Sequence, residues 1–263
     1  MYKMVVTDLD DTLLLNNKKI SEFTLFMFNQ LKEKGIKLAF ATGRSHHNAM
    51  ELVPKGLFDG TIAQNGAVAY VNNEVVHYLH ISPSDTRDIM LKAREHGIIS
   101  AAETASITYS YTDLSNSRIS WITNYMLVED DYLCEEVERI LFHVNDDIEL
   151  KLKDIAFLEE HMPDTVGYVV GRDGYAQIMK KEATKLEGVK ALCDYFGISI
   201  NEVVAFGDDT NDISMIKGCG KGIAMQNALA VVKDIADEIC DTNEYDGMAK
   251  WIFDNIKDFS NEV

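Results

Sequence analysis

The feature that most constrains this chain is an apolar strand that runs directly into a group of carboxylates near the N-terminus. Residues 4–6 are apolar and β-prone, and Asp8, Asp10 and Asp11 follow within a few residues. Carboxylates this close repel one another and resist joint ionisation unless a positive charge lies among them. A hard divalent cation bound by carboxylate oxygens meets that requirement. The sequence therefore favours a metal site at the end of the first strand.

The spacing of these acids also suggests a reaction. In an extended segment the side chains of Asp8 and Asp10 lie on one face, roughly 6.5–7 Å apart. One carboxylate can then attack a phosphorus atom while the other handles the proton of the leaving group. An acidic turn is the alternative. A calcium-binding loop is excluded, because Leu13 and Lys19 stand where that loop needs glycine and glutamate.

Composition limits the partners. The chain has 263 residues, long enough for two domains, and 25 Lys and Arg against 43 Asp and Glu give a formal charge of −18. Such a surface repels nucleic acid and anionic membranes, so neither is expected as a partner. The same field repels anionic substrates, so an enzyme acting on phosphates needs local cations.

The cysteines and the hydropathy indicate a reducing compartment. Cys134, Cys193, Cys219 and Cys240 are widely spaced, with no C-x-x-C pair and no histidine at zinc-finger spacing. They are expected to be buried thiols. The chain has no signal peptide pattern and no run of about 18 apolar residues. A cytoplasmic location is the expectation.

The chain opens with a β-α-β pattern. Ser21 is a candidate cap of a helix that ends at Gly35, and residues 36–41 form a short apolar run typical of a buried parallel strand. This strand ends at Thr42, followed by Gly43. Ligands of parallel sheets bind beyond the carboxyl ends of the strands, where a hydroxyl and a glycine amide suit a phosphate oxygen. The alternative for Thr42 is a simple helix cap.

The middle of the chain has a different character. Residues 61–71 predict a strand pair with a turn at Asn65 and Gly66. From residue 81 to 182 the pattern predicts a helix around Ile89, short aromatic strands, a long acidic helix near residues 130–142, and strands through 166–179. No acidic strand end of the first kind occurs there. We therefore expect an inserted α/β domain over 81–182.

The opening pattern returns in the last third. Lys185 begins a predicted helix that ends at Gly197, and the apolar run 203–206 ends in acid at Gly207–Asp212. A calcium loop fails again, because Cys219 would be its twelfth residue. A short strand over 222–225 and a closing helix over 231–236 follow. Residues 1–80 with 183–263 are thus predicted to form one domain, a doubly wound parallel α/β sheet.

The two acidic strand ends, the Thr42 strand end and Lys185 belong to one predicted sheet. Asp208 is placed as the second carboxylate of an octahedral Mg²⁺ site. Lys185 alone would be read as a solvated helix residue. Beside the acids it becomes the cation for a phosphoryl group and for holding Asp8 ionised.

Four motifs at these positions carry a family resemblance. They are Asp8–Thr12, Thr42–Arg44, Lys185 and Gly207–Asp212. With them the chain resembles the haloacid dehalogenase-like superfamily of phosphohydrolases, and within it the Cof-type (class IIB) sugar-phosphate phosphatases, which have a Rossmann-like core and a large inserted α/β cap. Further landmarks are Asn65–Ala67, Ala224–Ala228 and Asp246–Gly247. Asp11 departs from the family, which often has glycine there.

The resemblance implies a role for each motif residue. Asp8 would attack phosphorus and carry an aspartyl-phosphate, and Asp10 would protonate the leaving oxygen and then activate water. For the first task Asp10 must be neutral near pH 7, so its pKa should lie well above about 3.9. Phosphate or substrate would be held by the amides of Leu9 and Gly43 and by Thr42, Arg44, Lys185 and Asn211. Mg²⁺ would be ligated by Asp8, by the main-chain carbonyl of Asp10 and by Asp208, with Asp212 orienting these ligands.

Three functions compete. The first is a Mg²⁺-dependent phosphatase of small phosphomonoesters, sugar phosphates above all. A phosphomutase would need cap arginines that grip a second phosphate, for which Arg118 and Arg172 are the candidates. A phospho-accepting signalling module would need neither a cap nor Asp10. Candidate specificity residues are Trp121, Tyr125, His161 and Tyr168 of the cap and His46 and His47 of the core. A monomer or a weak homodimer is expected.

Overall fold

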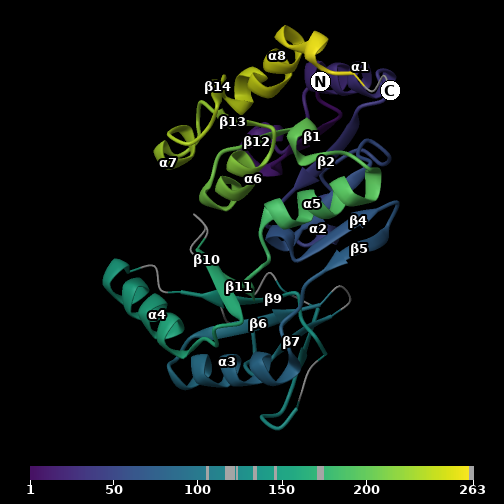
Figure 1. The fold of residues 1–263 in the computed structure, drawn as a ribbon. Helices are drawn as coiled ribbons and strands as arrows, with labels where there is room; N and C mark the ends of the chain where they lie inside the picture. The colour runs from purple at the N-terminus through teal and green to yellow at the C-terminus, as the bar shows by residue number, and fades with distance from the viewer. Residues whose placement is uncertain are drawn as a thin grey trace. The chain divides into compact units, whose positions relative to one another are not determined.

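The protein is described by a computed structural model that covers residues 1–104, 107–115, 122, 124–132, 135–144, 147–170 and 175–260 (Figure 1). The chain divides into two compact units. The core unit comprises residues 1–77 and 184–263, and the cap unit comprises residues 78–183. The sequence placed these divisions after residues 80 and 182. Each unit is described by itself.

The core unit is built on one eight-stranded sheet. Its strands in sheet order are β14 (Glu238–Cys240), β13 (Lys221–Met225), β12 (Val203–Gly207), β1 (Met4–Thr7), β2 (Lys37–Ala41), β3 (Gly60–Ala63), β4 (Val68–Val71) and β5 (Glu74–Tyr78). The pairs from β14 through β3 are parallel, and β3 and β4 are antiparallel. The β3–β4 pair turns at Gln64–Gly66, as the sequence predicted.

Helices cover both faces of this sheet. They are α1 (Glu22–Glu33), α2 (His46–Met50), α5 (Lys185–Phe196), α6 (Ile213–Gly218), α7 (Ala230–Lys233) and α8 (Gly247–Asp254). Phe40 packs edge-on against Phe58, which in turn packs against Phe28 of α1. Gly60, whose backbone pairs with the neighbouring Ala39, lies instead against Leu192 of α5. Because adjacent strand residues face opposite sides, α1 and α5 lie on opposite faces.

The register of the central strands fixes where the site lies. Thr7 of β1 is aligned with Phe206 of β12 and with Phe40 of β2. The residues that follow these strands therefore leave the sheet at the same edge. The N–H of Asp8 still donates to the carbonyl of Phe206 at 3.0 Å. The pairing of β1 with β12 brings the motifs Asp8–Thr12 and Gly207–Asp212 together, although they are distant in sequence.

One expectation for the core unit is wrong. The predicted closing helix over 231–236 is only the short α7, which ends at Lys233. The chain then forms the edge strand β14 and the longer α8, whose buried face includes Trp251 and Ile252. Trp251 packs edge-on against Phe206, so α8 completes the core over β12.

The cysteine expectation holds in part. Cys193 and Cys240 are buried and Cys219 is half-buried, all as free thiols, while Cys134 lies outside the described residues. Burial raises the pKa of Cys193 to about 11. This thiol is therefore protonated and unreactive near neutral pH.

The cap unit is a second α/β layer structure. Its sheet has the order β10 (Val166–Val170), β11 (Tyr175–Lys180), β9 (Arg139–His143), β6 (Ile99–Glu103), β7 (Thr108–Ser110) and β8 (Tyr125–Leu127). All of its pairs are antiparallel except β7 with β8. Helices α3 (Pro83–Glu95) and α4 (Ile148–His161) pack together, and Ile89 and Leu158 join one core with Phe142.

The acidic helix predicted near residues 130–142 is wrong. Residues 139–143 form β9, which lies between β11 and β6. Ile140, Leu141 and Phe142 are all buried. A central strand whose two faces are both covered, one of them by helices, carries apolar residues on both faces. A short continuous apolar run of this kind does not distinguish a strand from a helix.

Candidate active site

Three carboxylates meet at the edge of the core sheet. Asp8 follows β1, and Asp208 and Asp212 follow β12. One carboxylate oxygen of each lies within 4.8 Å of the others. Asp8 is 7% exposed, Asp208 2% and Asp212 0%. The sequence predicted Asp8 and Asp208 at this edge, and the parallel register brings them together.

Lys185 is buried between two of these carboxylates. Its Nζ donates to Asp8 Oδ1 at 2.6 Å and to Asp212 Oδ1 at 2.5 Å. The side chain is 0% exposed, so the solvated alternative is excluded. Lys185 is the first residue of α5, and the Thr184 hydroxyl caps this helix by accepting the N–H of Glu187 at 3.3 Å.

The electrostatics of the cluster are unbalanced in favour of negative charge. Burial raises the pKa of Asp8 well above its usual value, Lys185 opposes this, and the charges of Asp212 and Asp208 raise it further. Burial disfavours the Lys185 cation, but Asp212 and Asp8 outweigh it and raise its pKa. Lys185 is therefore charged at neutral pH, and one cation faces three carboxylates. A divalent ion with oxygen ligands fits this donor set in both charge and chemistry.

The surrounding hydrogen bonds orient the carboxylates. Asp212 Oδ2 accepts the N–H groups of Asp208 at 2.8 Å and Asp209 at 3.0 Å. The Thr12 hydroxyl donates to Asp208 Oδ1 at 2.9 Å. A Cβ on Gly207 would lie 2.5 Å from the Cβ of Asp212, so the strand end needs glycine there. Asp212 thus holds both Lys185 and the main chain that carries Asp208.

Asp10 is not a member of this cluster, and two cations bind its carboxylate. The Arg44 side chain donates to it twice, from Nε at 2.6 Å and Nη2 at 2.8 Å, and Lys18 Nζ donates at 2.7 Å. Burial favours the neutral acid, but the hydrogen bonds and charges of Arg44 and Lys18 outweigh it and lower the pKa of Asp10 to about 2. The expected raised pKa is therefore wrong for this conformation, because no local sequence pattern indicates that Arg44 and Lys18 both pair with Asp10.

The chain after Asp8 turns and does not continue as a strand. Residues Leu9–Leu13 form a tight turn, with Asp11 at a φ of 59°. This is the left-handed conformation that glycine adopts without strain, which accounts for the glycine that the family often has there. The Asn227 side chain donates to the carbonyl of Asp11 at 2.7 Å, and Asn243 donates to that of Leu14 at 2.9 Å.

The remaining predicted phosphate-binding residues surround the same strand ends. Thr42 directly follows β2 and is 2% exposed; its hydroxyl accepts the N–H of Arg44 at 3.2 Å. This hydroxyl does not cap α2, which begins after Ser45. Asn211, in the turn after β12, donates to Asn65 Oδ1 at 2.8 Å. Leu9 is fully buried beside Asp8. Sequence reasoning missed Lys18 and Asn243, which no local pattern marks.

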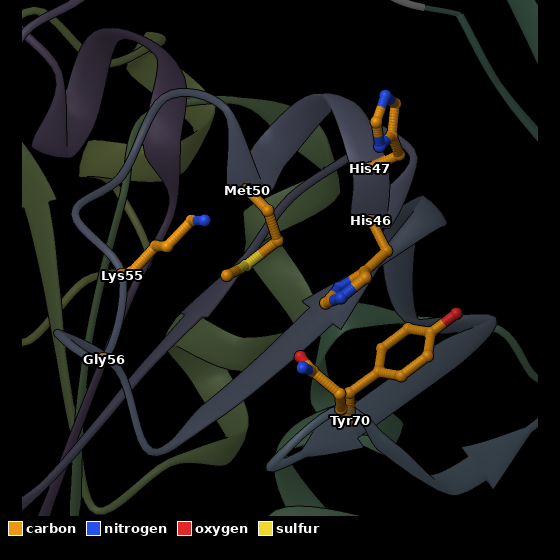
Figure 2. A pocket seen from close by; sticks show the side chains of 7 residues that line it. His46, His47, Met50, Lys55, Gly56 and Tyr70 are labelled. Atoms are coloured by element: carbon orange, nitrogen blue, oxygen red, sulfur yellow. The ribbon is translucent and has the colours of Figure 1, made fainter.

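His46 and His47 line a separate cavity of about 590 Å³ over α2 and β4 (Figure 2). The His46 ring stacks on Tyr70 with centroids 4.0 Å apart, and its Nδ1 lies 3.2 Å from the Thr61 hydroxyl. His47 is largely exposed and lies apart from that stack. Burial lowers the pKa of His46, so it is neutral at pH 7. Neither histidine is among the carboxylates.

The candidate specificity residues of the cap unit have partners within that unit. Tyr125 donates to Asp113 at 2.6 Å, His161 stacks on Phe157 with centroids 4.2 Å apart, and Tyr168 donates to Glu159. Trp121, Arg118 and Arg172 lie outside the described residues.

Comparison with known families identifies the class of protein. The family of haloacid dehalogenase-like hydrolases matches residues 5–252. The chain therefore belongs to the haloacid dehalogenase-like hydrolases. The sequence-based expectations of this superfamily, its hydrolytic chemistry and its capped α/β fold are confirmed.

Individual relatives extend over nearly the whole chain. The chain is 29% identical over 268 residues to the 5-amino-6-(5-phospho-D-ribitylamino)uracil phosphatase YitU of Bacillus subtilis, covering 95% of this chain and 96% of that protein. It is similar to the structure of BT1666, a phosphatase of this superfamily from Bacteroides thetaiotaomicron, with 26% identity, a TM-score of 0.80, and 97% and 95% of the two chains covered. A subclass IIB sugar phosphatase, BT4131, shares the fold with a TM-score of 0.79 at 24% identity, covering 96% and 98%.

Among the described residues, no helix combines the length and the apolar character needed to cross a membrane.

Proposed function

We propose that this protein is a Mg²⁺-dependent phosphatase of small phosphomonoesters that acts through an aspartyl-phosphate, with sugar phosphates as the leading substrate class. The observation that carries the proposal is the buried Lys185, which bridges Asp8 and Asp212 beside Asp208 at the end of a parallel sheet. The names of relatives such as the Bacillus phosphatase support the same reaction class.

The first step is nucleophilic attack by Asp8. Its carboxylate oxygen forms a bond to phosphorus while the bond to the leaving oxygen breaks. Lys185, 2.6 Å from Asp8, favours the ionised form of the nucleophile against the effect of burial and offers positive charge to the phosphoryl oxygens. The carboxylates of Asp8 and Asp208 and the main-chain carbonyl of Asp10 would hold a Mg²⁺ ion. When bound, the ion would supply positive charge that neutralises the phosphate and lowers the pKa of Asp8.

Asp10 would supply and then remove protons. It would protonate the leaving oxygen, and its carboxylate would then accept a proton from the water that hydrolyses the aspartyl-phosphate. Arg44 and Lys18 hold Asp10 as the carboxylate in the described conformation. Proton donation therefore requires these contacts to loosen. A substrate phosphate that draws Arg44 toward itself would have this effect.

The phosphoryl group would be held at the strand ends. Hydrogen-bond donors for its oxygens would be the amides of Leu9 and Gly43 and the side chains of Thr42, Lys185, Asn211 and Arg44. Because phosphoryl transfer depends on positioning and charge neutralisation, these fixed donors would supply much of the rate enhancement. The cap unit would select the leaving group.

The test is phosphate release from a panel of phosphomonoesters, with and without Mg²⁺, by the native protein and by Asp8→Asn. Asp11→Asn is the matched control, because it makes the same change three residues later, outside the carboxylate cluster. We expect metal-dependent turnover that Asp8→Asn abolishes and Asp11→Asn retains. No turnover on any ester would refute the proposal. Transfer of the phosphoryl group back to a sugar would favour a mutase, and an aspartyl-phosphate that persists for hours would favour a signalling module.

A further inference from the structure

The loop Gln64–Gly66 has no role in the chemistry described above. It joins β3 to β4, and its three residues all have positive φ, at 47°, 54° and 100°. Gln64 is not glycine, so this backbone conformation is strained there, whereas asparagine tolerates it at position 65. Strained segments persist only where their surroundings hold them, and they cluster at functional sites. The contacts of this loop show what it is attached to.

The main chain of the loop is hydrogen-bonded to the motif Thr42–Arg44. The N–H of Gln64 donates to the carbonyl of Arg44 at 2.9 Å, and the N–H of Asn65 donates to the carbonyl of Thr42 at 2.9 Å. Gly43 lies between these two anchored residues. A Cβ on Gly43 would be 3.1 Å from Asn65 Oδ1, so the Asn65 side chain packs directly against this turn. The orientation of the Gly43 amide is thereby fixed.

The Asn65 side chain is hydrogen-bonded to the motif Gly207–Asp212. Asn65 is 2% exposed, and its Oδ1 accepts a hydrogen bond from Asn211 Nδ2 at 2.8 Å. A side-chain amide carries two N–H groups in one plane. When one of them is directed at Asn65, the direction of the other is set as well.

The third residue of the loop packs on the start of α5. A Cβ on Gly66 would lie 1.9 Å from the carbonyl oxygen of Thr184, so only glycine allows this approach. Thr184 caps the helix whose first residue is Lys185. One short loop thus contacts three of the four chain segments that carry the phosphate-binding candidates, namely those at Thr42–Arg44, at Lys185 and at Asn211.

We propose that Asn65 is a positioning residue that orients the Asn211 amide and the Gly43 turn for a phosphoryl group. It acts through these two residues and does not itself touch the substrate. The inference rests on the proposed function, in which Asn211 and Gly43 hold phosphate oxygens. The left-handed backbone of Asn65 places this one side chain against both motifs.

The central test is Asn65→Gly, which removes the side chain while glycine keeps the positive φ without strain. Asn72→Gly is the matched control, because Asn72 also has a positive φ, of 52°, in a turn away from the carboxylates. We expect Asn65→Gly to lower kcat/KM by about 10²-fold, the cost of a small misplacement of reacting groups. Asn72→Gly should leave it unchanged. Equal kinetics of Asn65→Gly and the native protein would overturn the inference.

A double-mutant cycle separates positioning from folding. If Asn65 acts through Asn211, the double variant Asn65→Gly with Asn211→Ala loses less than the product of the two single losses. Losses that multiply would overturn this part of the inference. Should the glycine variant fail to fold, Asn65→Asp serves, because it keeps an acceptor for Asn211. Its kcat should remain near native while its KM rises, since the added charge repels phosphate; a kcat lost with KM unchanged would contradict the inference.

Binding of inorganic phosphate in the presence of Mg²⁺, measured by calorimetry, distinguishes the two proposals. We expect Asn65→Gly to bind phosphate at least about tenfold more weakly than the native protein. If the native protein binds phosphate but hydrolyses no ester, the proposed function is refuted. The phosphate affinity of Asn65→Gly then still tests the positioning role of Asn65. Native turnover with unchanged phosphate affinity in Asn65→Gly would refute the positioning role alone. A native protein that shows neither would refute both.

Discussion

The two units differ in where their backbone is strained. Among the described residues, every non-glycine residue with positive φ lies in the core unit: Asp11, Lys18, Gln64, Asn65, Asn72, Asn73 and Asp246. In the described part of the cap unit only Gly97 has a positive φ. Left-handed conformations at non-glycine residues need surrounding contacts to hold them. Among the described residues, left-handed backbone at non-glycine positions therefore occurs in loops of the core unit and not in loops of the cap unit.

Both units also contain a buried cation paired with a carboxylate. Lys185 of the core unit lies between Asp8 and Asp212 at a site with a proposed reaction. Arg139 of the cap unit is also buried, and its Nε donates to Glu103 at 2.6 Å inside the sheet. Both pairs require desolvation of a cation and its carboxylate partner. Buried charge alone therefore does not mark a reaction centre, and the proposed reaction at Lys185 rests on its place at the ends of parallel strands beside three carboxylates.

The largest expected effect comes from removing these two cations. Lys185→Met leaves Asp8 and Asp212 buried without a cation, so it should cost about 3–5 kcal/mol of unfolding free energy and abolish turnover. Arg139→Met, which leaves Glu103 unpaired, should cost a similar amount of stability yet retain turnover of a small phosphomonoester. Denaturant unfolding and a phosphatase assay measure both. Turnover by Lys185→Met, or its loss in Arg139→Met, would break the contrast.

Metal binding should stabilise the core unit more than the cap unit. Mg²⁺ at a hundred times its dissociation constant should add about 2.7 kcal/mol of stability, because it binds only the folded carboxylate cluster. Asp208→Asn should lose most of this gain. Hydrogen exchange should show the added protection at amides of residues 8–12 and 207–212, and little over 78–183. Equal protection in both units would argue against a metal site confined to the core.

Asp10 gives a smaller, pH-dependent effect. Its folded-state pKa of about 2 lies below the usual value, so the Arg44 contact stabilises the folded state above about pH 4. That contribution is lost as the pH falls from about 4 toward 2. The stability difference between native and Asp10→Asn should be constant from pH 7 to 5, stay below about 1 kcal/mol because the pair is partly solvated, and shrink below pH 4. Thermal unfolding across this range measures it, and a difference that grows on acidification would contradict it.

The smallest effect is expected for a glycine at the turn position Asp11, which has a positive φ. Asp11→Gly relieves the positive φ but loosens the unfolded chain, so its stability should lie within about 0.5 kcal/mol of native. Asp11→Ala keeps a Cβ without the local tolerance of aspartate, so it should be about 1 kcal/mol less stable than the glycine variant. Chemical denaturation ranks the three proteins. An alanine variant as stable as glycine would show that this turn is not strained.

Much of the core unit was predictable because parallel strands are buried on both faces. Residues 4–6, 36–41 and 203–206 are continuous apolar runs, and the acids directly after two of them needed only the parallel register to meet. Lys185 was predictable once those acids were placed. In the cap unit the same apolar signal at residues 140–142 was misleading, because a central antiparallel strand looks like one turn of a buried helix.

The loops could not be predicted at the same level. The pairing of Asp10 with Arg44 and Lys18 depends on how two turns close beside each other, and the Asn227 and Asn243 side chains reach carbonyls more than two hundred residues away in sequence. Such contacts leave no local pattern, since the partner is chosen by the folded main chain. The role of Asn65 was hidden for the same reason.

The position of the inserted unit has a consequence for how the chain is made. The central strand β1 pairs on one side with β12, so residues 4–7 lack this partner until residues 203–207 have been synthesised. During synthesis the whole of residues 78–183 emerges before this partner exists. The growing chain therefore carries an unpaired inner sheet edge, next to apolar residues, for most of its translation. Such edges invite aggregation, so folding of this enzyme should be slow and should depend on chaperones that shield the half-formed sheet.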